Sequence, residues 1–313
     1  MNIKKKLTVA IPVFNEELRI EKYIKTLISL KSFENIQILI SDDCSQDRTY
    51  SICKKYSDKY KNINLYSQKK NFGMPVKNFQ YLIEKCDTEY FMFGSPGDAM
   101  SNSFISDAIN LLESDFSCGL VFGQYDIRDI NSNKKIDIIP SSSTSNSVFS
   151  RYISRIIDMQ PALIYGMFRT QILKKIKLSH YDFFEVSLSL KVSIYAKIKI
   201  LNYKVWSWGI DSERKSHSIY PFKKWFSEKF LFKKKIKLKN NKTYLNKRYS
   251  ETQYENYRVF YLPFYFDQIK TIFSNFSFIK SILIFIILTY FVTAKIIKVL
   301  IKPNSSDLNF KNL

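Results

Sequence analysis

Residues 38–49 read Ile38-Leu39-Ile40-Ser41-Asp42-Asp43-Cys44-Ser45-Gln46-Asp47-Arg48-Thr49. A short apolar run bounded by turn residues indicates a buried strand, which here runs into two adjacent carboxylates. Asp47 is placed to cap the helix that is expected to follow. We therefore expect Asp42 and Asp43 at the carboxyl end of a strand, the edge at which open α/β sheets bind ligands. Asp is also common in turns, because its side chain accepts hydrogen bonds from nearby backbone N–H groups.

The same alternation of strand and helix continues through the first 125 residues. Helical spacing of apolar side chains predicts helices between strands expected at 7–13, 36–41, 63–66, 89–93 and 119–125. Strands that alternate with helices imply right-handed crossovers, and so an α/β fold with a mostly parallel sheet and helices on both faces. The polar run 140–147 is expected to be a loop or boundary, and a helix is expected at 181–197.

Composition limits the class of protein. The chain has 313 residues, of which 45% are hydrophobic and only 7 are Gly and 8 Pro, which excludes disordered and fibrous classes. Four cysteines without a C-x-x-C pattern and two histidines predict reduced thiols in a cytosolic protein rather than a structural zinc site. The basic N-terminus is followed by Pro12 and an acidic turn without a small-residue cleavage site, so secretion is not expected.

Charge is concentrated near the C-terminus. The formal net charge is +21, and residues 220–313 hold 18 Lys and Arg against 5 Asp and Glu. This distribution favours an anionic surface as partner, although the general abundance of Lys in the chain is an alternative explanation. Basic and aromatic residues together also suggest RNA, but no nucleic-acid-binding motif is present, and no nucleic acid is expected as partner.

Three motifs together resemble the inverting family 2 glycosyltransferases, whose glycosyltransferase A fold is Rossmann-like. They are Thr8-Val9-Ala10-Ile11-Pro12-Val13-Phe14-Asn15-Glu16-Glu17, then residues 42–49, then Asn71-Phe72-Gly73. The resemblance covers residues 6–125 and, more weakly, 160–218. It implies an enzyme that takes a nucleotide-diphosphate sugar as donor. The donor-binding residues implied are Pro12, Phe14, Glu16, Asp42, Asp43, Asn71, Gly73 and Asp98. Glu16 also has the alternative role of an acid that complements a helix dipole.

The chain departs from the family pattern after the fourth predicted strand. The family carries an acidic cluster there that binds a divalent cation, whereas this stretch reads Gly94-Ser95-Pro96-Gly97-Asp98. One carboxylate can still hold Mg²⁺ or Mn²⁺, because such ions keep several waters and use substrate phosphates as ligands. Three alternatives follow, in this order: a cation held by Asp98 and the diphosphate, basic side chains in its place, or impaired activity.

The second half is expected to serve the acceptor. By resemblance, an acid near the start of the 181–197 helix is the general base that takes the proton of the acceptor hydroxyl, with Asp182 first and Glu185 in reserve. An acid that merely starts a helix is the alternative. Trp208, Arg214 and His217 are assigned to the acceptor or diphosphate side, although Trp206 and Trp208 could equally form the core face of a strand.

The C-terminal third is expected to be helical and basic. Residues 281–294 form an uncharged apolar stretch. This stretch is too short for a typical membrane span and fits an interfacial or buried helix. Residues 220–248, with 11 basic residues and one acid, suit anionic head groups. We therefore expect a catalytic domain at 1–218, with a donor half at 1–128 and an acceptor half at 148–218. A membrane-associated region is expected at 219–313.

The resulting hypothesis is a cytoplasmic enzyme, peripheral on the inner face of the cell membrane. It would transfer a sugar to a hydroxyl of a cell-surface glycan or lipid-linked acceptor. One alternative is a catalytically degenerate homologue that binds nucleotide or glycan as a partner subunit, which the glycine at position 97 keeps open. A nucleotidyltransferase of similar architecture is the other, and it lacks support because no early glycine-rich phosphate loop is present.

Overall fold

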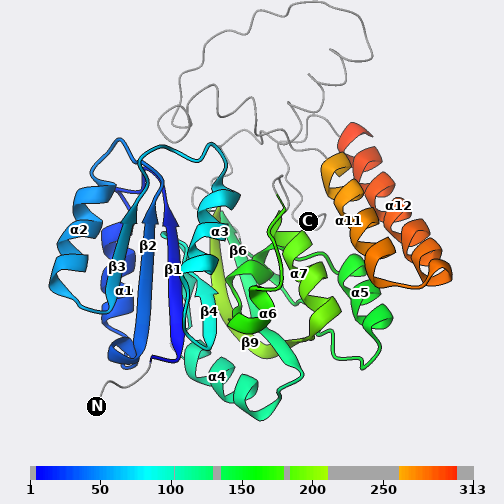
Figure 1. Cartoon of the computed structure of the whole chain (residues 1–313), viewed down its shortest axis with the longest axis horizontal. Helices are drawn as coiled ribbons and strands as arrows, with labels where there is room; N and C mark the ends of the chain where they lie inside the picture. Colours follow the sequence, from blue (N-terminus) through cyan, green and yellow to red (C-terminus); the bar gives the residue numbers. More distant parts are fainter. Residues whose placement is uncertain (1–4, 102, 130–134, 180–183, 211–260, 302–313) are drawn as a thin grey trace, which may run out of the picture.

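A nine-stranded mixed sheet with helices packed against it forms the body of the protein (Figure 1). The computed structural model describes residues 5–101, 103–129, 135–179, 184–210 and 261–301. The strand order is β3-β2-β1-β4-β8-β6-β9-β5, and β7 pairs with β6 outside this path. The strands are β1 (Leu7–Val13), β2 (Ile36–Asp42), β3 (Ile63–Ser67), β4 (Tyr90–Phe93), β5 (Ala99–Met100), β6 (Cys118–Asp129), β7 (Lys135–Ile138), β8 (Met167–Arg169) and β9 (Lys197–Ile210).

The helices alternate with these strands and end in a C-terminal pair. They are α1 (Ile20–Ile28), α2 (Thr49–Lys59), α3 (Pro75–Lys85), α4 (Phe104–Ser114), α5 (Val148–Ile157), α6 (Thr170–Leu173), α7 (Phe184–Tyr195), α11 (Tyr261–Asn275) and α12 (Phe278–Ile301). Two short 3₁₀ turns, η1 (Phe33–Asn35) and η2 (Pro161–Tyr165), precede β2 and β8.

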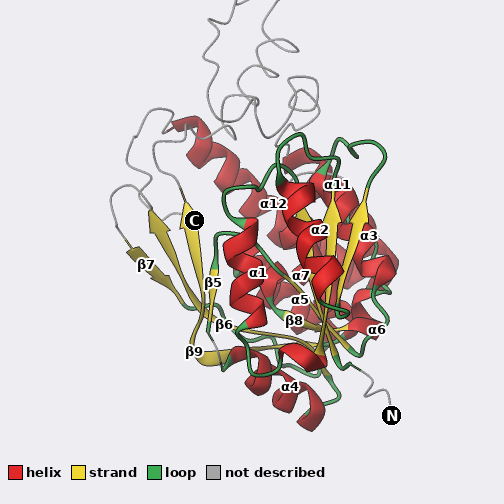
Figure 2. Cartoon of the chain, turned by 90° about the vertical axis from the view of Figure 1, so that its left-hand side faces the viewer, coloured by secondary structure: helices red, strands yellow, loops and turns green. Residues whose placement is uncertain are grey.

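The first half of the sheet follows from its apolar runs. In β1 six of the seven residues are buried, as expected for a strand covered on both faces. β1 lies between β2 and β4 and is parallel to both, with Val9 opposite Ile38 and Met92. Right-handed crossovers then require α1 and α2 on one face and α3 on the other, because the chain reverses direction across the sheet after β3. Figure 2 shows α1 and α3 on opposite sides of the strands.

That reversal places a topological switch point between β1 and β4. The chain leaves β1 toward β2 and β3 and returns to the other side of β1 as β4. The loops that leave the two neighbouring strands therefore part in opposite directions and open a crevice at their carboxyl ends. The fold expected from the sequence, a mostly parallel α/β sheet with helices on both faces, is confirmed in this half.

The second half of the sheet is mixed. β8 runs antiparallel to both β4 and β6, whereas β6 and β9 are parallel to each other. The short β5 is antiparallel to β9 and brings Ala99 opposite Ser207. The sequence predicted the loop at 140–147, but it missed α5 and treated residues 198–208 as two segments where the structure has the single strand β9. The helix predicted from 181 is described from Phe184 as α7, and residues 180–183 lie outside the described part.

The C-terminal helices pack on the second half through their own core. Buried side chains of α5, α7, α11 and α12 form a cluster separate from the main core: Tyr152, Ile156, Val186, Leu190, Phe264, Ile272, Ile284 and Leu288. This confirms the helical character predicted for the described C-terminal residues. Within the described ranges, none of the helices combines the length and the hydropathy of a membrane span. All four cysteines are free thiols.

Candidate active site

A cavity of about 230 Å³ opens at the switch point between β1 and β4. Its walls come from the loops after both strands and from the first residues of α3 and α7. Among the predicted site residues it brings together Pro12, Phe14, Glu16, Asp43 and Glu185. The other lining residues are Val13, Pro75, Asn78, Phe79, Gly94, Ser95, Pro96, Tyr165 and Phe184. Residues from the predicted donor half and the predicted acceptor half therefore share one cavity.

Asp43 links the cavity to the loop that follows β3. Its carboxylate accepts a hydrogen bond from the Phe72 N–H at 2.8 Å, and its carbonyl oxygen accepts one from the Asn71 amide at 2.8 Å. The Asn71 side-chain oxygen accepts from the Gly73 N–H at 2.7 Å, and Gly73 has a positive φ of 75°, which glycine adopts readily. Burial raises the pKa of the Asp43 carboxyl to about 7.

Asp42 has a different setting from its neighbour. Its side chain accepts hydrogen bonds from the Ser45 hydroxyl and from the Ser45 N–H, so it closes the turn after β2. It is 1% exposed and does not line the cavity, and burial raises the pKa of its carboxyl. Of the two neighbouring acids, Asp42 therefore has the contacts of a turn residue, the alternative that the sequence left open for Asp42 and Asp43. A direct contact of Asp42 with a donor remains a prediction.

The first two motifs are hydrogen-bonded to each other. The Asn15 N–H donates to the Ser45 hydroxyl at 2.9 Å, and the Glu16 N–H donates to the Thr49 hydroxyl at 2.7 Å. Asp47 accepts from the Thr49 N–H at 2.9 Å, although the N-cap position of α2 belongs to Arg48, not to Asp47 as the sequence suggested. These bonds fix the loop after β1 against the loop after β2.

Glu16 is buried in the loop after β1, and its carboxylate pairs with the Arg19 guanidinium. The Arg19 guanidinium donates to both carboxylate oxygens of Glu16 at 2.9 Å. Arg19 also lies against Gly97, where an added Cβ would be 3.0 Å from the Arg19 Cδ. A basic side chain that sequence reasoning did not single out therefore borders the turn that carries Asp98.

The phenol of Tyr165 lines the cavity and is influenced by the charges of two predicted acids, Asp98 and Glu185. Burial raises the pKa of its phenol first, and the charges of Asp98 and Glu185 raise it further. Its ring stacks on Trp206 with centroids 4.9 Å apart and planes 8° from parallel. Asp98 also raises the pKa of the buried Tyr23, after burial itself. The sequence gave no sign that Tyr165 lines the cavity, because the antiparallel β8 that follows it was not predicted.

The remaining predicted residues divide into two groups. Trp208 is half-buried on β9, one residue beyond Ser207, the partner of Ala99 in the β5 pairing, and so lies near the turn of Asp98. Trp206 is instead fully buried, as a strand residue of the core would be. Asp182, Arg214 and His217 fall in residues 180–183 and 211–260, outside the described part.

The protein offers few ligands for a divalent cation. Among the residues that the structure describes, no group of three or more His, Cys, Asp or Glu side chains could hold a metal ion. Asp98 is the one acid in the Gly94–Asp98 turn after β4. This fits a cation only if the donor diphosphate and water supply most of its ligands, as Mg²⁺ sites commonly allow.

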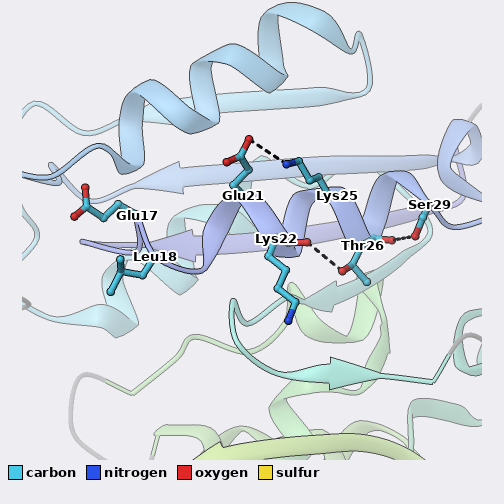
Figure 3. A pocket seen from close by; sticks show the side chains of 7 residues that line it. All are labelled: Glu17, Leu18, Glu21, Lys22, Lys25, Thr26 and Ser29. Atoms are coloured by element: carbon cyan, nitrogen blue, oxygen red, sulfur yellow. Dashed lines mark hydrogen bonds and ion pairs between the residues drawn. The ribbon is translucent and has the colours of Figure 1, made fainter.

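A second hollow, of about 510 Å³, lies along α1 and has no comparable chemistry (Figure 3). All of its lining side chains come from residues 17–29, and Leu18 is among the exposed ones. The ammonium of Lys25 lies 3.5 Å from the Glu21 carboxylate, in a helical i,i+4 pair. The hollow is a shallow surface of one helix, so the cavity at the switch point remains the candidate active site.

A family comparison agrees with this geometry. The model of glycosyl transferase family 2 matches residues 8–176, more than half of the chain. The matched range includes the loops after β1, β2 and β4, and it ends before α7.

Relatives with known names match over shorter segments. The chain is 31% identical over 107 residues to the minor teichoic acid biosynthesis protein GgaB of Bacillus subtilis, covering 34% of this chain and 12% of GgaB. It is 36% identical over 103 residues to the dTDP-rhamnosyl transferase RfbG of Shigella flexneri, covering 32% of this chain and 35% of RfbG. The chain therefore spans well under half the length of either relative.

Solved structures support the same fold. The structure of residues 1–349 of TarS from S. aureus aligns with a TM-score of 0.52 and 19% identity, covering 66% of this chain and 60% of that one. The TarS structure in complex with UDP-GlcNAc aligns with the same TM-score and covers 58% of that chain. At this level of identity the likeness concerns the fold.

Proposed function

The chain belongs to glycosyl transferase family 2 and is a glycosyltransferase, and from that premise we propose its donor, acceptor and mechanism. The donor is a nucleotide-diphosphate sugar, and the acceptor is a hydroxyl of a cell-surface glycan or lipid-linked molecule. Transfer proceeds with inversion at the anomeric carbon. The observation that carries this proposal is that Asp43 and Glu185, from opposite halves of the chain, line one cavity.

The donor half has the chemistry that a nucleoside needs. Asp43 is a buried carboxylate in a cavity, and a carboxylate there accepts a hydrogen bond from a base N–H or a ribose hydroxyl. Phe14 and Pro12 supply apolar surface for a flat base. TarS, whose structure has a similar fold, has been solved in complex with UDP-GlcNAc. Among the donor residues proposed, Asp42, Asn71 and Gly73 act by shaping the loops around Asp43.

The acceptor side supplies the base. Inverting transfer needs a group that takes the proton from the acceptor hydroxyl as its oxygen attacks the anomeric carbon, while the nucleoside diphosphate leaves from the opposite side. Asp182 was the first candidate from the sequence and Glu185 the second. Because Glu185 lines the cavity at the start of α7, we propose it as the base, with Asp182 as the competing candidate. Trp208, Arg214 and His217 remain proposed contacts of acceptor or diphosphate.

A divalent cation, Mg²⁺ or Mn²⁺, is proposed at Asp98. When bound, such a cation offsets the negative charge of the leaving diphosphate. The protein contributes one carboxylate at this turn, and Arg19 brings a positive charge to the same turn from its pair with Glu16. Arg19 supports the alternative in which a basic side chain shares the work of the cation.

The proposed setting is the cytoplasmic face of an anionic membrane. Residues 1–218 form the catalytic domain in this proposal, divided into donor (1–128) and acceptor (148–218) halves. Residues 219–313 form the region that meets the membrane. The support is the charge distribution, with 18 basic against 5 acidic residues in 220–313.

A panel of nucleotide sugars tests the proposal. We expect one nucleotide to raise the thermal midpoint of the purified chain, with and without Mn²⁺, because a ligand that binds only the folded state stabilises it by mass action. Radiolabelled transfer to glycan or lipid-linked acceptors then tests turnover. Stabilisation without transfer to any acceptor would favour the degenerate homologue, for which Gly97 in place of a second acid is the supporting feature. No stabilisation by any nucleotide sugar would contradict the donor assignment.

A further inference from the structure

The outer side of α12 carries a stripe of exposed apolar side chains. Ile279, Ile282, Leu283 and Ile286 are all exposed, with fractions between 41% and 81%. Their spacing of three, four and seven residues places them on one side of the helix. We call these four residues the α12 stripe. Monomeric soluble proteins rarely leave such contiguous apolar surface in water, so the stripe calls for a partner.

The opposite side of α12 is already covered. Ser281, Ile284 and Leu288 are fully buried and face α5 and α11. Figure 1 shows α12 as the outermost helix at one end of the molecule, with α11 on its inner side. The packing therefore fixes α12 on the body of the protein and directs the α12 stripe away from it.

The exposed charges described on α11 and α12 are basic. Residues 278–301 contain three lysines and no acid. The acid of α11, Asp267, turns inward, where its carboxylate lies 3.0 Å from the Lys191 ammonium of α7. Lys270 and Lys280 are exposed. Among the described side chains of α11 and α12, the exposed charges are thus basic and lie beside exposed apolar residues, which is the composition of elements that lie in the interface of an anionic membrane.

We propose that the α12 stripe inserts into the head-group region of an anionic lipid bilayer, with α12 lying in the plane of the membrane. Lys270 of α11 and Lys280 of α12 would contact the lipid phosphates. A second copy of this chain is a poorer occupant, because a symmetric pairing would bring like-charged lysines of α12 toward each other. This inference rests on the proposed membrane setting and narrows the membrane-facing region from residues 219–313 to one side of α12, whereas the catalytic proposal is independent of it.

The structure connects this surface to the cavity through α7. Glu185 at the start of α7 lines the cavity, and two residues later the Ser187 hydroxyl donates to Asp267 of α11 at 3.1 Å. Gln268 of α11 donates to the same hydroxyl at 3.0 Å. A bilayer against α12 would therefore be linked to the cavity through α7, the helix that carries the proposed base Glu185.

Vesicle flotation of the full chain tests the proposal. We expect it to float with vesicles of phosphatidylglycerol and phosphatidylcholine and to bind phosphatidylcholine alone far less. The triple variant Ile279→Ser, Leu283→Ser, Ile286→Ser should lose on the order of tenfold or more in partitioning, since both apolar burial and charge contribute. Because these side chains are exposed, the fold should tolerate the change, and an unchanged thermal midpoint would verify this.

The matched control is Ile139→Ser, directly after β7. It removes an apolar side chain of similar exposure, 72% against 81% for Ile279. It should float like the wild type. Failure of the wild type to bind the anionic vesicles overturns the proposal, and so does equal binding of the triple variant. A wild-type dimer that becomes monomeric in the triple variant without lipid assigns the stripe to a second copy instead. Donor binding, read by thermal shift, is scored separately, so loss of the membrane result leaves the catalytic proposal untouched.

Discussion

Asp42 and Asp43 are neighbours in the chain, yet only Asp43 lines the cavity. Asp42 accepts hydrogen bonds from the side chain and N–H of Ser45, whereas Asp43 accepts from the Phe72 N–H and faces the space between β1 and β4. One carboxylate shapes the turn, and the other is available to a ligand. The two can therefore be separated by mutation.

Asp43→Ala should weaken nucleotide binding by about tenfold to a hundredfold, the value of a hydrogen bond to a charged group. Asp42→Ala should instead lower stability by about 1–3 kcal/mol, because it leaves the Ser45 donors without their acceptor. Isothermal titration with the nucleotide and chemical denaturation of both variants measure the two effects. Equal losses of affinity in both variants would show that Asp42 also contacts the donor.

The raised pKa of Asp43 predicts a pH dependence of stability. Its pKa is about 7 in the folded protein, against a reference value of 3.8, so the folded state binds the extra proton between these values. Its contribution to stability is therefore present below pH 3.8 and is lost as pH rises toward 7. Asp43→Asn removes this group, so the difference in thermal midpoint, wild type minus variant, should fall from pH 4 to pH 7.

The same ionisation should act oppositely on the ligand. If the donor hydrogen-bonds to the Asp43 carboxylate, nucleotide affinity should increase as pH rises through about 7 and the carboxyl ionises. Titrations at pH 6 and pH 8 with wild type and Asp43→Asn measure this. A wild-type affinity as flat with pH as that of the variant would rule out the ionised form as the binding state.

Glu185→Gln tests the general base. We expect it to lower kcat by about a hundredfold to ten-thousandfold while donor affinity changes little, because the amide cannot take the acceptor proton. Asp182→Asn is the matched variant, since it neutralises the other acid of the same segment. Loss of turnover in Asp182→Asn alone would transfer the role to Asp182. Equal loss of donor binding and turnover in Glu185→Gln would refute its role as base.

Chelation tests the cation at Asp98. EDTA should lower turnover, and Mn²⁺ or Mg²⁺ should restore it, because the cation offsets the diphosphate charge. Asp98→Asn should remove most of the difference in nucleotide affinity between the metal-loaded and chelated protein. Indifference of the wild type to EDTA would favour a site in which Arg19 takes the role of the cation, and Arg19→Gln should then reduce nucleotide affinity.

The buried Tyr23 ring packs closely against Gly94, a residue that lines the cavity, and this contact predicts the effect of a mutation. A Cβ at Gly94 would lie 2.5 Å from the Tyr23 hydroxyl oxygen and 2.9 Å from its Cε1. Because Tyr23 is buried, Gly94→Ala should destabilise the fold by about 1–3 kcal/mol through overpacking. Adding Tyr23→Phe should restore part of the loss in urea denaturation. A Gly94→Ala variant as stable as wild type would show that the ring moves aside freely.

Local pattern was sufficient for the first half of the chain. The apolar runs of β1, β2 and β4 are short, buried and bounded by turn residues, so their position and the loops at their carboxyl ends could be predicted. Gly73, which the family resemblance named, has a φ of 75° that glycine adopts at little cost. The strands of the second half could not be predicted in the same way. β8, for example, has only three residues and is defined by its antiparallel partners rather than by its own sequence pattern.

By itself, the sequence determined the order of strands and helices around the donor half and the chemical types of its site residues, since these follow from periodicity and turn chemistry. Only the tertiary structure decided which of two adjacent carboxylates lines the cavity, that Tyr165 stacks on Trp206 beside it, and that Glu185 reaches it from α7. These depend on contacts between residues distant in the chain, which local patterns do not encode. The same holds for α12, whose apolar residues are buried on one side and exposed on the other because of where α5 and α11 pack.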